Sequence, residues 1–129
     1  MPRSNDDNIR MSFIAAADLS TYQYCFVKFS AKNTVNICGA SEDMIGILQN
    51  KPDAAGKAAS VVLLGVSQLR VDGNAGAITR GTSYLESNST GEGVVTTTDK
   101  DPVGALALES SSAANDQIPV LVTRLKHTG

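Results

Sequence analysis

The stretch from Asp101 to Leu125 constrains the fold more than any other part of the chain. It contains a short apolar run with an early glycine, Val103 to Leu108, then a polar break, then a β-branched run, Ile118 to Leu125. Two apolar runs of this length around a polar break are typical of paired β-strands, and the serines of the break disfavour a helix. Pro119 cannot donate to a β-ladder, so we expect it at a sheet edge or a bulge. The stretch predicts two strands that close an all-β fold.

An earlier part of the chain repeats this pattern. An apolar run with an early glycine is followed, after a polar loop, by a second apolar run, Ala59 to Leu64. Gly46 lies sixteen residues before Val62, and Gly104 lies sixteen residues before Val120. The equal spacing fits a duplicated β unit, although a chain rich in glycine and valine could also produce it by chance.

The segments between these runs also favour β structure. As a strand, Cys25 to Phe29 would place Cys25, Val27 and Phe29 on one face and Phe26 and Lys28 on the other. Thr34 to Cys38 returns after a polar reversal, which predicts a hairpin. Ala58 to Val71 is expected to form one long strand bent at Gly65, with apolar residues on both faces of its first half. Shorter strands are predicted at residues 83–86 and 94–98. Helical periodicity is weak throughout, so the predicted fold is all-β, a small β-barrel with long loops and little helix.

The composition indicates one domain without a nucleic-acid or membrane role. A chain of 129 residues is long enough to bury a core, and its formal net charge of −2 provides no basic face for a phosphate backbone. No run approaches the roughly 20 apolar residues that span a bilayer. The N-terminal residues lack the pattern of a signal peptide. We therefore expect a soluble protein, made in a cytoplasm, that binds neither nucleic acid nor a membrane directly.

No catalytic, cofactor or metal site is predicted. Cys25 and Cys38 are the only cysteines and His127 is the only histidine, so a zinc site would have too few ligands. We expect two buried thiols, with a disulfide or a redox pair as the alternative. A Ser-His-Asp arrangement would require His127, near the C-terminus, to fold back over a hydroxyl. The expected protein is not an enzyme and needs no cofactor.

The N-terminal segment suggests a docking element. Residues 1–10 are polar and are expected to form a flexible arm, followed by a single β domain over residues 11–129. The apolar strand that begins at Met11 has no evident partner elsewhere in the chain. The arm is either an idle tail or a segment that docks along another subunit. On the second hypothesis, partner contacts are expected at Ile9, Arg10, Met11, Phe13 and Ile14.

The chain resembles the capsid decoration (cement) proteins of tailed bacteriophages, in the group with a small β-barrel or β-tulip fold. The resemblance covers about residues 15–124 and rests on glycines and aliphatic residues that shape the fold: Ala31 to Leu48, Val61 to Val71 with Gly73 and Gly76, Gly81 before Tyr84 and Leu85, Val103 to Glu109, and Ile118 to Val122. It implies a virion protein on the outer capsid surface. Such a protein binds the assembled major capsid protein, commonly as a homotrimer, and stabilises the shell by bridging neighbouring subunits. The polar N-terminal segment and Pro119 depart from the pattern of this family.

A small glycan-binding β module is the main alternative from a different class. Glycan sites usually present exposed aromatic side chains, and Tyr22 and Tyr24 on either side of Gln23 could form such a platform. The other interpretation is that these tyrosines pack at the rim of the barrel.

Overall fold

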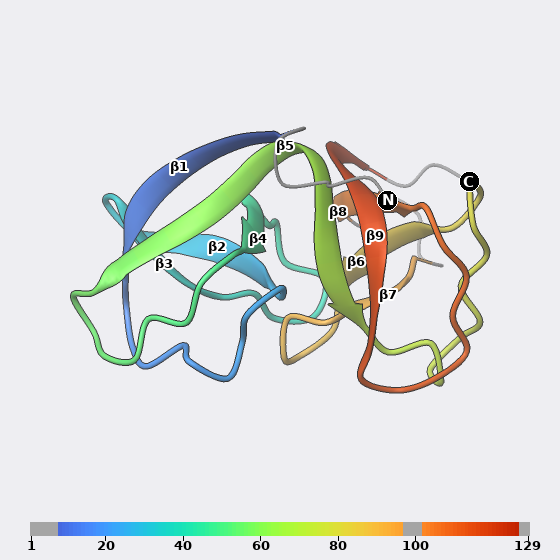
Figure 1. Cartoon of the computed structure of the whole chain (residues 1–129), viewed down its shortest axis with the longest axis horizontal. Helices are drawn as coiled ribbons and strands as arrows, with labels where there is room; N and C mark the ends of the chain where they lie inside the picture. The colour runs from blue at the N-terminus through green and yellow to red at the C-terminus, as the bar shows by residue number, and fades with distance from the viewer. Residues whose placement is uncertain (1–7, 97–101, 127–129) are drawn as a thin grey trace.

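The computed structural model describes residues 8–96 and 102–126, which form strands, turns and loops but no helix (Figure 1). The all-β class is therefore confirmed. No membrane-spanning helix occurs within these two ranges. The strands in chain order are β1 (Asn8–Ala15), β2 (Phe26–Ala31), β3 (Thr34–Ile37), β4 (Gly46–Leu48), β5 (Ala58–Val71), β6 (Tyr84–Ser87), β7 (Gly93–Val95), β8 (Pro102–Ala107) and β9 (Asp116–Lys126).

The strand pairings run round two circuits that share β5. In the first circuit β1 pairs with β3, β3 with β2, β2 with β4, β4 with β5, and β5 with β1. In the second circuit β5 pairs with β7, β7 with β6, β6 with β8, β8 with β9, and β9 with β5. Figure 1 shows the two circuits side by side, one on each side of the bend in β5.

The bend that divides β5 lies at Gly65. This residue has a φ of 106°, in a region that residues with a side chain rarely adopt. It stands opposite Asn8 of β1 and opposite Val122 of β9, so the ladders of the two circuits meet at it. In Figure 1, β5 rises beside β1, bends at the top of the view and descends beside β9. The predicted single strand with a bend at this glycine is confirmed.

Two hydrophobic cores lie on opposite faces of the wall formed by β2, β4 and the first half of β5. Val27 belongs to the first core, inside the first circuit, whereas its neighbour Phe26 belongs to the second core. The same division separates Leu48 from Ile47 and Val61 from Val62. Since successive side chains of a strand point to opposite faces, a wall with a core on each side requires apolar residues at consecutive positions. This arrangement explains the unbroken apolar run at the start of β5.

The predicted hairpin and the predicted closing strands are both present. β2 and β3 pair antiparallel around a turn in which Asn33 has a φ of 55°, and β8 pairs antiparallel with β9. Pro119 differs from expectation because β9 has a strand on each side. Its carbonyl accepts a hydrogen bond from the Leu108 N–H at 3.0 Å, just beyond the last β8–β9 pair, Ala107 with Val120. The proline is tolerated in an interior strand because it stands where one ladder ends.

Candidate partner-binding site

β1, which carries the five predicted contact residues, is an integral strand of the first circuit. It pairs antiparallel with β5 from Asn8 opposite Gly65 to Ile14 opposite Ala58. The expectation of a strand without a partner in its own chain is therefore wrong, because the first half of β5 offers a long edge for pairing. Strand pairing between segments this far apart in the sequence produces no pattern that either segment shows by itself.

The boundary of the predicted arm also moves. Ile9 and Arg10, which we expected in the arm, belong to β1, and residues 1–7 lie outside the described residues. Ile9 and Met11 are 59% and 52% exposed, and Ile14 is exposed as well. Arg10 is exposed, and its Nε donates to Oδ1 of Asn8 at 3.0 Å. Four of the five predicted residues thus lie at the surface.

Phe13 is the exception, and it connects β1 to an exposed residue that the sequence analysis did not single out. Phe13 is only 8% exposed, and its ring meets the ring of Phe29 edge to face, with the centroids 5.2 Å apart. Phe29 itself is 51% exposed. Phe29 lies in β2 on the same face as Val27 and close to the turn. The sequence pattern, which places it at the end of an apolar face, could therefore have identified it.

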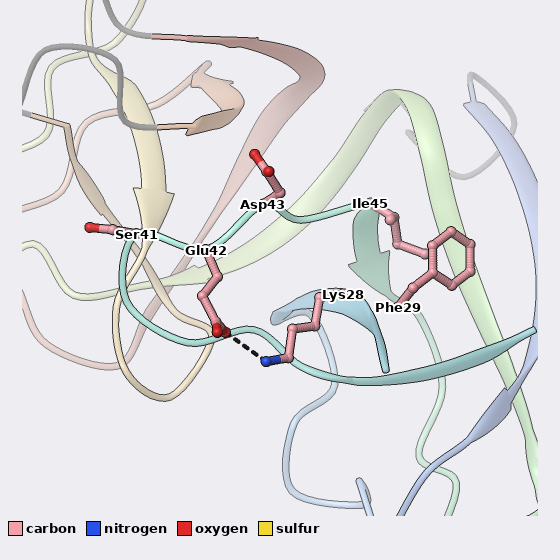
Figure 2. Close-up of a pocket in the computed structure, with 6 residues that line it drawn as sticks. All are labelled: Lys28, Phe29, Ser41, Glu42, Asp43 and Ile45. Carbon is pink, nitrogen blue, oxygen red and sulfur yellow. Dashed lines mark hydrogen bonds and ion pairs between the residues drawn. The ribbon is translucent and has the colours of Figure 1, made fainter. Parts of the chain in front are cut away.

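Phe29 lines a pocket of about 580 Å³ between β2 and the loop that leads into β4. We call this space the β2 pocket; its lining residues are Lys28, Phe29, Ser41, Glu42, Asp43 and Ile45. Figure 2 shows Phe29 and Ile45 at one end of the pocket, Ser41 at the other, and the charged groups between them. The pocket therefore joins an apolar surface to a polar one.

An ion pair crosses the polar part of the β2 pocket. Nζ of Lys28 lies 2.8 Å from Oε1 of Glu42, which also accepts a hydrogen bond from the Gly39 N–H at 2.7 Å (Figure 2). The bond from Lys28, followed by that from Gly39, lowers the pKa of Glu42, and the same pair raises the pKa of Lys28. Both groups are thus charged at neutral pH. No pattern in the sequence links Glu42 to Lys28.

The loop that carries Glu42 is anchored to the second circuit. The N–H of Ser41 donates to the carbonyl of Ser87 at 3.3 Å, and its hydroxyl lies 3.4 Å from Oε1 of Glu86. Ser41 has a φ of 59°, which turns the chain sharply at this point. The wall of the β2 pocket is therefore held by contacts to both circuits.

A second exposed apolar surface crosses the outer face of the second circuit. Tyr84 of β6 stands opposite Leu106 of β8, Leu106 opposite Leu121 of β9, and Leu121 opposite Val66 of β5. Directly opposed residues of neighbouring strands place their side chains on the same face, so these four form one row. Tyr84 and Leu121 are exposed and the other two are half-buried. We call this set the outer row.

The residues considered for other chemistry are placed as follows. Tyr22 packs against the first core and Tyr24 against the second, which favours packing over a glycan-binding platform. Cys25 and Cys38 are buried and free, as expected for small apolar side chains. His127 lies outside the described residues. Within the described ranges, His, Cys, Asp and Glu side chains form no group of three that could hold a metal ion.

Comparison with known proteins shows a similarity in fold. No protein-family model and no curated protein sequence matches the chain. Among solved structures, the chain is similar to the N base of the head fiber gp8.5 of bacteriophage phi29, with a TM-score of 0.63 and 15% sequence identity. The alignment covers 92% of this chain and 98% of that one. The similarity therefore extends over nearly the whole of both folds.

Proposed function

We propose that the chain is a structural protein of a bacteriophage virion. It binds the outer surface of the assembled capsid and stabilises the shell by bridging neighbouring copies of the major capsid protein. The observation that carries the proposal is the likeness to a phage head-fiber base over 92% of the chain. The resemblance of the sequence to phage decoration proteins supports it independently.

The distribution of exposed apolar side chains is compatible with a bridging role. Ile9, Met11 and Phe29 are exposed on the first circuit, and the outer row lies on the second. Apolar surfaces on both halves of one molecule can contact two neighbours at once. We propose the homotrimer implied by the family resemblance as the form that binds the shell, made from chains synthesised in the host cytoplasm.

Binding to capsids tests this function directly. Heads of the phage that encodes the chain, prepared without it, are mixed with the purified protein and sedimented. We expect the chain to pellet with the heads and the decorated heads to resist heating better than bare ones. A native mass measurement of the purified chain is expected to give a trimer. A monomer that ignores heads but binds an oligosaccharide would replace this proposal with the glycan-binding alternative.

The contribution of β1 can be tested in the same assay. Replacing Ile9 and Met11 together by serine removes two exposed apolar side chains without opening a core, so binding to heads should weaken while stability changes little. Lys57→Ser, in an exposed loop, is the control. Equal binding by both proteins would remove β1 from the contact surface and leave the proposed function standing.

A further inference from the structure

In the part of the chain that the structure describes, one edge of β2 is paired with another strand over only part of its length. β4 begins at Gly46 and pairs with β2 only at Phe26 and Val27, whereas β3 pairs with the other edge of β2 as far as Ala31. Among the described residues, the part of β2 from Lys28 to Ala31 is therefore open on the β4 side. An open strand edge is a template for pairing with another chain.

The β2 pocket lies at this open edge. Lys28 and Phe29 belong both to the open part of β2 and to the pocket lining. The exposed ring of Phe29 and the side chain of Ile45 form its apolar end, and the loop residues Ser41 to Asp43 face them across the space (Figure 2). Backbone available for pairing and room for a side chain thus occur together.

The charges around the pocket indicate what could enter it. Glu42 and Asp43 contribute two carboxylates to the lining and Lys28 contributes one ammonium group. The Glu42 carboxylate is ionised at neutral pH, and the hydrogen bonds from Lys28 and Gly39 lower its pKa further. A ligand with a positively charged side chain complements this surface better than an acidic one.

We propose that an extended segment of a partner protein adds to the open edge of β2 as a further strand and fills the β2 pocket. The segment places an aliphatic side chain against Phe29 and Ile45 and a lysine or arginine beside Glu42 and Asp43. Main-chain hydrogen bonds to the strand edge supply affinity in this mode of recognition, and the pocket supplies specificity. The inference rests on the proposed function in one respect, because it assigns the segment to the major capsid protein.

Two assays test the proposal with the full-length chain. The first measures binding to heads by sedimentation. The second measures binding to an array of overlapping synthetic peptides that covers the major capsid protein. Peptides with an aliphatic residue near a lysine or arginine should bind. Hydrogen exchange should show new protection of the Phe29 amide, which lies on the same edge of β2 as the Val27 carbonyl that Ile45 contacts.

Matched variants locate the contact. Phe29→Ser should weaken both peptide and head binding by about tenfold or more, whereas Phe29→Leu, which keeps an apolar side chain, should restore most of it. Asp43→Lys should weaken binding in low salt, and Asp53→Lys, the same change in an exposed loop, should not. Thermal melting of each variant shows whether it is folded.

The outcomes separate this proposal from the function on which it rests. If heads bind but none of the variants changes binding and the Phe29 amide gains no protection, strand addition is wrong and the virion role stands. If heads do not bind but peptides bind through Phe29, the β2 site stands and the virion role is wrong. Absence of binding in both assays, or protection of the Phe29 amide caused only by self-association, overturns the strand-addition proposal.

Discussion

Phe26 and Val27 are adjacent in β2 and both fully buried, yet their side chains lie in different cores. The backbone between them is therefore a partition with packed apolar groups on both sides. Cavities made on either side of this partition should weaken the same wall, so the two circuits are expected to unfold together.

Truncating each side chain in turn tests this expectation. Phe26→Ala should lower the free energy of unfolding by about 3 to 5 kcal/mol, and Val27→Ala by a smaller amount, because less buried volume is lost. Urea unfolding followed by circular dichroism should give a single transition for both variants. Two separate transitions in either variant would show that the circuits unfold independently.

Gly104 in β8 should tolerate no side chain. A Cβ at this position would lie 2.6 Å from Cε1 of Phe26 and 2.7 Å from Cγ of Met44. Gly104→Ala should therefore destabilise the protein by about 1 to 3 kcal/mol, since the packed ring and thioether must shift. Gly76→Ala is the matched control, because a Cβ there meets nothing within 4 Å. Melting temperatures that fall equally in the two variants would contradict this account of the packing.

The buried thiols should be unreactive while the protein is folded. Burial raises the pKa of Cys25 to about 11 and also raises the pKa of Cys38. Because the thiolate is the reactive form, a disulfide reagent at pH 8 should label neither residue in the native protein. Both should react once the protein is unfolded in guanidinium. Rapid labelling of the native protein would mean that the wall next to Cys25 opens readily.

The ion pair in the β2 pocket should contribute to the acid sensitivity of the fold. Hydrogen bonds from Lys28 and Gly39 lower the pKa of Glu42 in the folded state. The resulting stabilisation is present above the unfolded-state pKa of about 4.3 and is lost as the pH falls through the folded-state value. The urea midpoint of Glu42→Gln should therefore fall less than that of the unaltered protein between pH 6 and pH 3. The difference should be small, because both partners are partly solvated.

Asp116 is a second carboxylate whose pKa is lowered in the folded state, so its stabilisation of the fold should also be lost as the pH falls. Hydrogen bonds from the Ser111 hydroxyl at 2.7 Å and from the Gln117 N–H at 2.9 Å lower its pKa. Ser111→Ala should raise that pKa toward its ordinary value, which a two-dimensional NMR titration of the carboxyl group can measure. An unchanged titration would mean that the bond from Gln117 alone is sufficient.

The parts of the fold that were predictable from the sequence are those with local signals. The apolar face of Cys25 to Phe29 and the polar reversal after it predict the β2–β3 hairpin, and Gly65 in an apolar run predicts the bend in β5. The pairing of β1 with β5 joins residues about fifty positions apart and leaves no such signal. The ion pair between Lys28 and Glu42 joins residues fourteen positions apart across a loop, and no pattern in the sequence indicates it.

The site was predicted only in part. Ile9, Met11 and Ile14, which we predicted as partner contacts, are exposed on β1, and the contacts themselves stay a prediction. The sequence pattern could not show that Phe13 turns inward and meets Phe29, because that contact depends on how the circuit closes. The open edge of β2 depends on where β4 begins, a position set by the loop that precedes Gly46.

Because both circuits share β5, the fold has no point at which it could be divided into two independent halves. A break before Ala58 would leave the first four strands without the one that closes their circuit, and a break after Val71 would do the same to the last four. Neither half can therefore be exchanged for a homologous half as an independent module. Any shuffling of this fold between proteins would have to move both circuits together, whereas the loops that connect the strands can vary separately.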